Sequence, residues 1–350
     1  MVKMAPVEQE LSKEITVSSI AVLGTAHPHV MQVAQEIHGV AGAKLIGVYD
    51  GDPARLKESA GQLKIPAYSD LAELLALKPK LVLVGSVPCD RAKLAEKGMR
   101  AGASAVVDKP LALGVEDLDK VRRASRETGR RVMVLYPYRG HPLVRVARKA
   151  LLAGRIGKLV RIFAAGPHKV NAVSRPGWFW HPEKNGGIFV DIGSHHIDFC
   201  CWMADQSPSW VSAVQGNFDQ PNHPEFSDFG QAHLRFGSGV LAHVEVDWLN
   251  PVSMRSFGDT RFWLLGTRGK IELRLGDEST GHIWTESAAA EALKGEGPDM
   301  GQWTNQMIEN LLNDRPVEID QEEVWRTSAA TLAVQAEADL GEMREGKQKN

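Results

Sequence analysis

Acidic, basic and flexible residues occupy one short stretch of this 350-residue chain, from Gly186 to Asp198. If the chain is helical from Asp191 onward, Asp191, His195 and Asp198 fall at positions i, i+4 and i+7 and share one face. A histidine beside a carboxylate can be oriented for proton transfer. One alternative is a core helix whose polar groups are satisfied. Another is a metal site that includes His196, but adjacent residues on a helix point about 100° apart, so His195 and His196 would not face the same ion. We therefore predict an acid–base site without a metal ion.

A second unusual group, Asp108, Lys109 and Pro110, directly follows the apolar residues 103–107. A lysine that comes after a buried strand lies at the carboxyl edge of a parallel sheet, where ligands bind. Pro110 restricts the backbone of Lys109 to an extended or cis-turn geometry. A solvated loop lysine is the simpler alternative. Together with the Asp191 segment, Lys109 indicates a catalytic site shared between two distant parts of the chain.

The turn after the first expected strand has part of a dinucleotide-binding pattern. The glycines of a G-x-G-x-x-G turn let backbone N–H groups approach a pyrophosphate at the N-terminus of a helix. Here these positions hold Gly24, Ala26 and His29, so an ordinary strand–helix turn is the alternative. Asp50 ends the next expected strand, where an acid binds the adenosine ribose and repels a 2′-phosphate. The pattern therefore favours NAD over NADP, unless Asp50 only caps a helix.

Two further groups of side chains are candidates for ligand contacts. Trp178 and Trp180 come just before the glycine pair, and their aromatic faces suit the apolar C–H faces of a sugar ring. Core packing is the alternative for both. His27 and His29 flank a proline in the glycine-poor turn, so they either contact a ligand or cap the following helix.

The elements that must position these residues follow two different patterns. In the first 138 residues, strands expected at 15–24, 44–50, 80–86, 103–108 and 131–136 alternate with helices, which indicates a doubly wound parallel sheet. After a helix at 141–153, most of the chain has strand-like runs separated by turn signals, at 158–165, 209–217, 229–236, 240–246, 261–265 and 270–275. Helices at about 303–313 and 322–341 follow. We predict a dinucleotide-binding domain at 16–138 and an α+β domain at 139–345.

Composition excludes several classes of protein. The net charge is −2, and neither a basic run nor an apolar run of about 18 residues is present, so we expect no nucleic-acid partner and no membrane span. The three cysteines are too few for a disulfide framework, and residues 1–19 lack the apolar region of a signal peptide. We expect a cytoplasmic protein.

The motifs together resemble those of the Gfo/Idh/MocA oxidoreductases, the family of glucose–fructose oxidoreductase and inositol dehydrogenase, over about residues 16–340. The stretch from Gly186 to Asp198 is similar to the family's G-G-x-x-x-D-x-G-x-H-x-x-D pattern. Asp108-Lys109-Pro110 is similar to its Glu-Lys-Pro motif, and Pro88 to its Thr-Pro turn. The chain departs from the family at Ala26 and His29 in the glycine turn.

The resemblance implies a Rossmann domain followed by an α+β domain with a large, mainly antiparallel open sheet that often makes dimer or tetramer contacts. It implies a catalytic set of Lys109, Asp191 and His195. We expect the cofactor to contact Gly24, Thr25, Ala26, His27, His29, Asp50, Ser86, Pro88 and Lys109. We expect the substrate to contact Lys109, Trp178, Trp180, Asp191, His195 and His196.

The resulting hypothesis is an NAD-dependent dehydrogenase that acts on a secondary alcohol of a sugar, cyclitol or related polyol. His195 would accept the hydroxyl proton, and Lys109 would stabilise negative charge on the same oxygen. Asp191 would orient His195 or bind a neighbouring hydroxyl. One alternative is a redox-neutral enzyme that uses tightly bound NAD to cleave glycosides or to epimerise sugars. Another is a non-catalytic sensor of sugars or dinucleotides.

Overall fold

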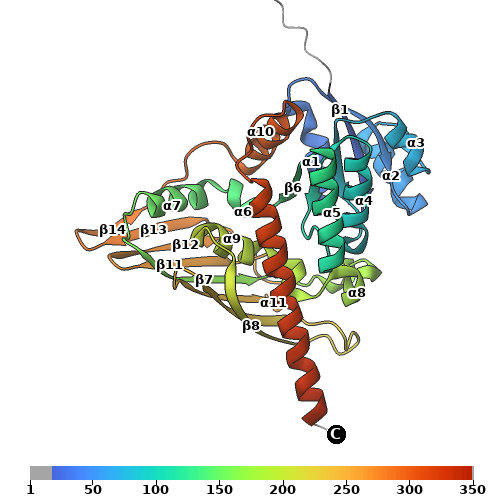
Figure 1. The fold of residues 1–350 in the computed structure, drawn as a ribbon. Helices are drawn as coiled ribbons and strands as arrows, with labels where there is room; N and C mark the ends of the chain where they lie inside the picture. The colour runs from blue at the N-terminus through green and yellow to red at the C-terminus, as the bar shows by residue number, and fades with distance from the viewer. Residues whose placement is uncertain (1–17, 349–350) are drawn as a thin grey trace, which may run out of the picture.

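The computed structural model describes residues 18–348, which form two β-sheets flanked by helices (Figure 1). The amino-terminal elements are β1 (Ser18–Thr25), α1 (Pro28–Glu36), a 3₁₀ turn (Ile37–Gly39), β2 (Ala43–Tyr49), α2 (Pro53–Leu63), β3 (Ala67–Tyr68), α3 (Leu71–Ala76), β4 (Leu81–Gly85), α4 (Pro88–Arg100), β5 (Ser104–Asp108), α5 (Val115–Thr128) and β6 (Val132–Leu135). All six of these strands pair in parallel, in the order β3-β2-β1-β4-β5-β6.

This order places a topological switch between β1 and β4, because the chain proceeds outward from β1 in both directions. In such sheets ligands bind beyond the carboxyl ends of the strands at the switch. Every residue of β4 and of β5 is buried, as expected for parallel strands covered on both faces. The doubly wound parallel sheet predicted from the sequence is therefore confirmed.

The second sheet is large and mostly antiparallel. Its elements and the helices around it are α6 (Pro137–Gly140), α7 (Pro142–Leu152), β7 (Leu159–Pro167), two 3₁₀ turns (Ala172–Ser174 and Gly177–Trp180), α8 (Pro182–Asn185), a π-helical turn (Phe189–Gly193), α9 (Ser194–Ala204), β8 (Pro208–Gly216), β9 (Phe229–Phe236), β10 (Leu241–Asp247), β11 (Thr260–Gly266), β12 (Gly269–Leu275), β13 (Thr280–Thr285), β14 (Ala288–Ala292), α10 (Met300–Leu312) and α11 (Gln321–Gln348). The strand order is β14-β13-β12-β11-β7-β10-β9-β8, and only β7 and β10 pair in parallel.

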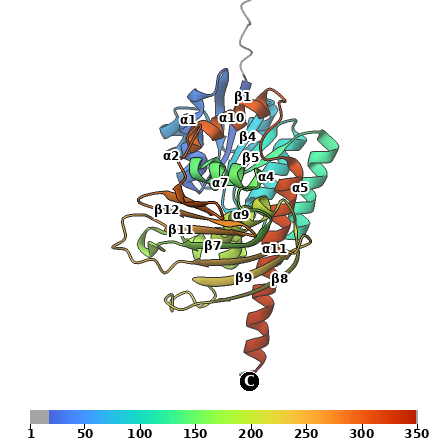
Figure 2. The same ribbon diagram turned by 90° about the vertical axis from the view of Figure 1, so that its left-hand side faces the viewer.

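Helices α7, α9 and α11 lie on the side of the second sheet that faces the first sheet (Figures 1 and 2). A long hydrophobic core joins α9 to the inner face of the sheet, with Phe199 stacked on Phe262 at 3.7 Å between ring centroids. The core around the first sheet includes side chains from α10 and α11, such as Trp303 and Trp325. The end of the chain therefore returns to the first sheet and ties the two layers together.

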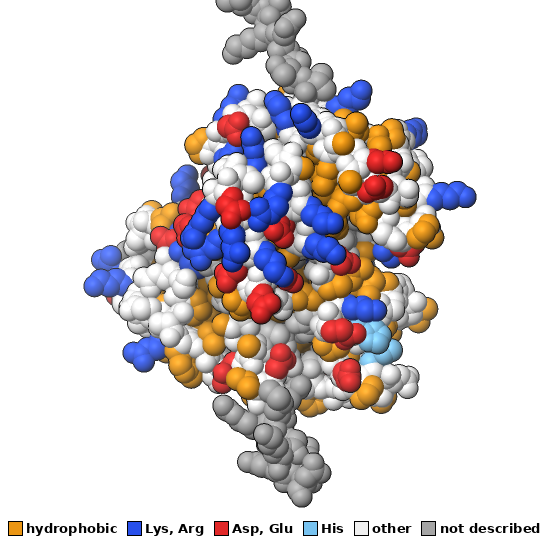
Figure 3. All heavy atoms as spheres, turned by 45° about the vertical axis from the view of Figure 1, so that its right-hand side comes forward, with side chains coloured by type: hydrophobic (Ala, Val, Ile, Leu, Met, Phe, Trp, Pro, Cys, Tyr) orange, Lys and Arg blue, Asp and Glu red, His pale blue; other side chains and the backbone are white. Residues whose placement is uncertain are grey.

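Basic side chains gather on the face that includes α4 and α5, and acidic side chains lie among them (Figure 3). Ion pairs such as Arg100–Glu127 and Lys120–Asp117 connect the two kinds of charge. In the described part of the chain, no helix is long and apolar enough to span a membrane.

The sequence placed most of the longer elements correctly but missed several features, including short elements such as β3 and α8. Strands β13 and β14 were not expected, α10 begins earlier than predicted with a capping box between Asp299 and Gln302, and a π-helical turn precedes α9. The expected first strand began at residue 15, and residues 15–17 lie outside the described part of the chain.

Candidate active site

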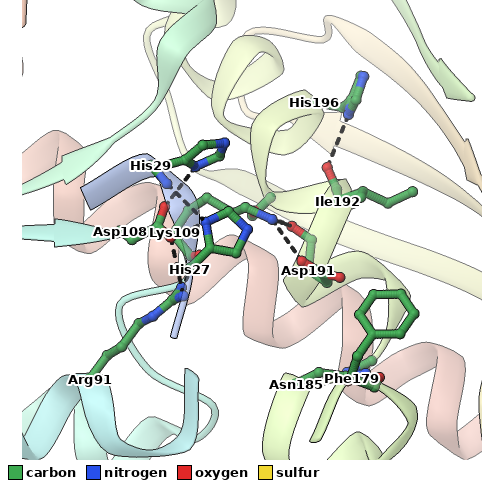
Figure 4. Close-up of polar contacts among 12 residues, drawn as sticks. His27, His29, Arg91, Asp108, Lys109, Phe179, Asn185, Asp191, Ile192 and His196 are labelled. Carbon is green, nitrogen blue, oxygen red and sulfur yellow. Dashed lines mark hydrogen bonds and ion pairs between the residues drawn. The ribbon is translucent and has the colours of Figure 1, made fainter. Parts of the chain in front are cut away.

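Lys109 follows the carboxyl end of β5 and extends to the π-helical turn before α9 (Figure 4). Its Nζ donates hydrogen bonds to Asp191 Oδ1 at 2.7 Å and to the Asp191 carbonyl oxygen at 2.8 Å. The Lys109 side chain is only 5% exposed, and the Lys109–Pro110 peptide bond is cis. An ammonium group has three N–H donors, so one remains for a ligand oxygen.

Arg91, a residue that the sequence analysis did not identify, holds the Asp108–Lys109 turn in place. Its guanidinium is fully buried and donates hydrogen bonds to the Lys109 carbonyl oxygen and to Asp108 Oδ2. Arg91 extends from α4, so it fixes the backbone from which the Lys109 side chain projects.

Asp191 and His195 differ in their charge near neutral pH, because their pKa values are shifted by burial and by Lys109. Burial alone would raise the pKa of Asp191, but the charge and hydrogen bond of Lys109 outweigh it and lower that pKa below its usual value. Burial, reinforced by the charge of Lys109, holds the pKa of His195 well below 6.5. Asp191 is therefore an anion and His195 a neutral imidazole near neutral pH. The Nδ1 atom of His195 is buried and has no hydrogen-bond partner among the described residues.

Asp191, His195 and Asp198, predicted to share one helical face, do not form one hydrogen-bonded group in the described structure. Asp191 lies in the π-helical turn, which holds more residues per turn than an α-helix and so changes the register. Asp198 is buried and accepts hydrogen bonds from Arg139 at 2.8 and 2.9 Å and from Thr327 at 3.0 Å. No hydrogen bond joins Asp191 to His195 in the described structure; Asp191 instead holds Lys109.

His196 points away from the Lys109–Asp191 pair (Figure 4). It is fully buried, its Nδ1 lies 3.2 Å from the Ile192 carbonyl oxygen, and its ring packs against Tyr138 and beneath Gly166. The structure therefore does not bring His196 together with the other predicted substrate contacts.

Two residues that the sequence analysis missed lie near His195 or near the Lys109–Asp191 pair. Tyr138 makes an edge contact with the ring of His195 and shares a 2.6 Å hydrogen bond with Thr260. His168 is influenced by the charges of Lys109 and Asp191, and burial lowers its pKa to about 4. Tyr138 comes shortly after β6, and His168 comes directly after β7. This position just beyond the end of a strand is the sequence signal that could have identified both residues.

A cavity of about 530 Å³ adjoins Asp191 and is lined by Gly186, Gly187, Phe226 and Trp248, among others. Trp178 and Trp180 are not among its lining residues. Trp180 stacks on His223 with 4.0 Å between ring centroids, and it also contacts Phe226.

The predicted cofactor loop has the shape that a dinucleotide requires at Gly24. This residue has a φ of +80°, and a Cβ atom there would lie 2.5 Å from the Cβ of Ser86. A cavity of about 670 Å³, lined by Gly24, Asp50, Arg55 and Ser86, opens beyond β1, β2 and β4. Asp50 accepts hydrogen bonds from Thr25 N at 2.8 Å and Thr25 Oγ1 at 3.0 Å. These residues fit the adenosine half of a nicotinamide adenine dinucleotide, NAD or NADP.

The rest of the loop is unusual because Ala26 and His29 replace the second and third glycines and Pro28 removes an N–H donor. His27 caps α1, and its Nδ1 lies 2.8 Å from Asp108 Oδ2, while His29 Nδ1 lies 3.1 Å from Asp108 Oδ1. In residues 18–348 these three side chains are the one group spaced closely enough to hold a metal ion. Arg91 also forms an ion pair with the Asp108 carboxylate. Burial would raise the pKa of Asp108, but the charges of His27, Arg91 and His29 outweigh burial and hold this pKa well below its usual value.

The remaining predicted cofactor residues lie at the same sheet edge. Ala26 is half-buried in the loop between β1 and α1, and Pro88 is the first residue of α4. The structure thus gathers all of the predicted cofactor residues around the carboxyl ends of β1, β2, β4 and β5.

Comparisons with known proteins agree with this arrangement. Residues 18–136 match the model of an oxidoreductase family with an NAD-binding Rossmann fold, and residues 144–272 match the GFO/IDH/MocA C-terminal domain. Scyllo-inositol 2-dehydrogenase (NAD(+)) from Bacillus subtilis (strain 168) is 26% identical over 72% of each chain. The match to 1,5-anhydro-D-fructose reductase from Ensifer adhaerens is 28% identical and covers 49% of this chain, but only half (50%) of that relative.

The fold is also similar to that of an oxidoreductase candidate from Erwinia carotovora atroseptica SCRI1043, whose crystal structure gives a TM-score of 0.84 at 26% identity. That match covers 92% of this chain and 98% of the other. The two family models together span most of the chain, including the first sheet, strands β7 to β11 of the second sheet and the Lys109–Asp191 pair. The chain therefore belongs to the Gfo/Idh/MocA oxidoreductases, whose first domain is an NAD-binding Rossmann fold.

Proposed function

We propose that this oxidoreductase transfers hydride between NAD and a secondary alcohol of a sugar, cyclitol or related polyol. The observation that carries the proposal is the hydrogen bond between Lys109 Nζ and Asp191 Oδ1, with the buried His195 one turn further along the chain. The names of the relatives, an inositol dehydrogenase and an anhydrofructose reductase, support a polyhydroxylated substrate.

The residues of the chain divide the proton chemistry between them. Lys109 donates its third N–H to the substrate oxygen and stabilises negative charge on it. His195 is neutral because of its lowered pKa, so it can accept the proton of the hydroxyl group. Asp191 holds the Lys109 ammonium in place through two hydrogen bonds, and its second carboxylate oxygen would bind a neighbouring hydroxyl. Bound NAD supplies the hydride acceptor.

The preference for NAD over NADP rests on Asp50. The carboxylate is 5% exposed and is held by Thr25, by the backbone of Asp52 and by Arg55. Its hydrogen bonds lower its pKa against the effect of burial, so it stays charged beside the adenosine cavity. An anion at that position disfavours a 2′-phosphate.

The proposed substrate contacts are Lys109, Asp191 and His195, joined by Trp178 and Trp180 only if a ligand extends toward the loop after β7. His196 is not included because it is buried beneath β7. We assign no metal ion to the site.

We also propose a homodimer or homotetramer that uses the open face of the second sheet. No helix covers this face in the described part of the chain (Figure 2). Exposed side chains such as Trp210 and Leu241 support a partner there.

We also propose a domain boundary between residues 138 and 139. We propose a cytoplasmic location as well, which the three free cysteines support.

The test is to titrate the purified protein with NAD⁺ and with NADP⁺ by calorimetry, and then to screen polyols for NADH formation. We expect tighter binding of NAD⁺ and turnover of at least one cyclitol or sugar. Failure to bind either dinucleotide would contradict the proposal.

A further inference from the structure

Arg175 is held rigidly in the loop that follows β7. Its Nε donates a 2.6 Å hydrogen bond to the Val170 carbonyl oxygen, and Nη2 lies 3.4 Å from the Lys169 carbonyl oxygen. The guanidinium carbon lies 4.3 Å from the ring centroid of Phe179 and 4.6 Å from that of Trp248. Aromatic faces and backbone carbonyl groups therefore fix the guanidinium in one orientation.

This guanidinium lies directly behind the wall of the cavity that contains Asp191. Trp248, on which it stacks, lines the cavity beside Asp191. Phe179, another of its aromatic contacts, accepts a hydrogen bond at its carbonyl oxygen from Asn185, which lines the same cavity. Burial lowers the pKa of Arg175, and the negative charge of Asp191 opposes that shift.

The charge of Arg175 has no carboxylate partner. The other buried cations of this region are paired: Lys109 with Asp191, and Arg91 with Asp108. Among residues 18–348, neither Arg175 nor the buried Lys169 forms an ion pair, and the Lys169 ammonium bonds only to the Met254 carbonyl oxygen. Partly buried cations without a counter-ion are costly, so the loop carries positive charge that a ligand can neutralise.

We propose that Arg175 binds a carboxylate of the substrate, so that the enzyme acts on an acidic polyol, such as a sugar acid or a carboxylated cyclitol. The inference rests on the proposed dehydrogenase function and adds the class of substrate. The edge of the guanidinium that carries Nη1 has no partner in the described structure, and an N–H fork matches a carboxylate group. Lys169 adds positive charge behind it.

The experiment compares acidic ligands with their neutral counterparts on the full chain saturated with NADH. The pairs are D-glucuronate with D-glucose, D-gluconate with D-glucitol, and L-tartrate with L-threitol, measured by calorimetry. We expect at least one acid to bind about tenfold more tightly than its neutral partner. Arg175→Gln should remove most of this preference, and Arg175→Lys should restore only part of it. Arg155→Gln, an exposed control that pairs with Glu291 of β14, should leave the preference unchanged.

Each other result contradicts the inference. Equal or weaker binding of all three acids overturns it, as does a preference that survives in Arg175→Gln. Tighter binding of D-glucose 6-phosphate than of either hexose acid would assign the loop to phosphate rather than to carboxylate. If NADH itself does not bind, the proposed function fails; if a neutral polyol is oxidised without any acid preference, only the inference about Arg175 fails.

Discussion

Asp191 Oδ1 lies 2.7 Å from Lys109 Nζ, although the two residues are 82 positions apart in the chain. The bond connects the carboxyl edge of the parallel sheet to the π-helical turn that precedes α9. It makes Asp191 the partner of the lysine rather than of the histidine. The site therefore holds a charged Lys109–Asp191 pair and a separate neutral imidazole, which suits the transfer of a proton beside a hydride.

Replacing Lys109 by methionine should lower kcat/KM by about 10³-fold, because the substrate oxygen loses its positively charged donor. The binding of NAD⁺ should change little. The charge of Lys109 also lowers the pKa of His195, so its removal should shift the acidic limb of the pH profile to higher pH. Steady-state kinetics between pH 5 and 9 would measure both effects.

Lys120→Met is the matched control, since Lys120 is exposed and pairs only with Asp117. It should leave the rate and the profile as in the wild type. An unchanged acidic limb in Lys109→Met would contradict the electrostatic link between Lys109 and His195.

Replacing Arg55 by alanine should increase the preference for NAD⁺ over NADP⁺. The guanidinium of Arg55 lies 3.0 Å from Asp50 Oδ1 and partly neutralises the carboxylate that repels a 2′-phosphate. Without it the repulsion grows, so the dissociation constant of NADP⁺ should rise several-fold more than that of NAD⁺. Calorimetric titration with each dinucleotide gives the ratio of the NADP⁺ to the NAD⁺ dissociation constant, and an unchanged or lower ratio in Arg55→Ala would contradict the prediction.

The fold was predictable because strand and helix patterns alternate strictly in the first 138 residues. Buried strands such as β4 are continuously apolar, and Asp52 caps α2 just before Pro53, which are local signals. Strand β14 (Ala288–Ala292) was not predictable, because alanine and glutamate favour strands weakly and all of its residues are exposed.

The site was only partly predictable for a different reason. Lys109, Asp191 and His195 belong to local motifs, whereas Arg91 and Arg175 act through contacts that exist only after folding. The face shared by Asp191 and Asp198 was predicted from the α-helical period, and a π-helical turn changes that period without a sequence signal that we could identify.

Acidification should destabilise the protein in part through His196. Burial, followed by the charge of His168, lowers the pKa of His196 to about 3, whereas an unfolded histidine titrates near 6.5. Between these values the unfolded chain binds more protons than the folded one, so the free energy of unfolding falls as pH falls. The slope for one such histidine is about 1.4 kcal/mol per pH unit.

His196→Phe should therefore flatten the dependence of the free energy of unfolding on pH between 6 and 4. Phenylalanine suits the site because the ring packs against Tyr138 and Phe262. Urea denaturation at several pH values gives the slope, and the exposed His38→Phe serves as the control. The prediction fails if both variants keep the wild-type slope.

Asp198→Asn should reduce stability rather than catalysis, in contrast to Asp191→Asn. Asp198 is 1% exposed and receives two hydrogen bonds from the buried guanidinium of Arg139, so its neutralisation leaves a buried cation with one fewer partner. Breaking such a pair costs about 3 kcal/mol. Asp191→Asn removes the anion that holds Lys109, so it should lower kcat about 100-fold or more.

The two variants are compared by urea denaturation and by turnover at a temperature where both remain folded. Glu323, which also pairs with Arg139, should limit the damage in Asp198→Asn, so that the variant still folds. If Asp198→Asn instead keeps its stability and loses turnover as Asp191→Asn does, then Asp198 takes part in the chemistry. That result would support the prediction from the sequence, in which Asp198 belongs to the catalytic group, over a structural role in the ion pair with Arg139.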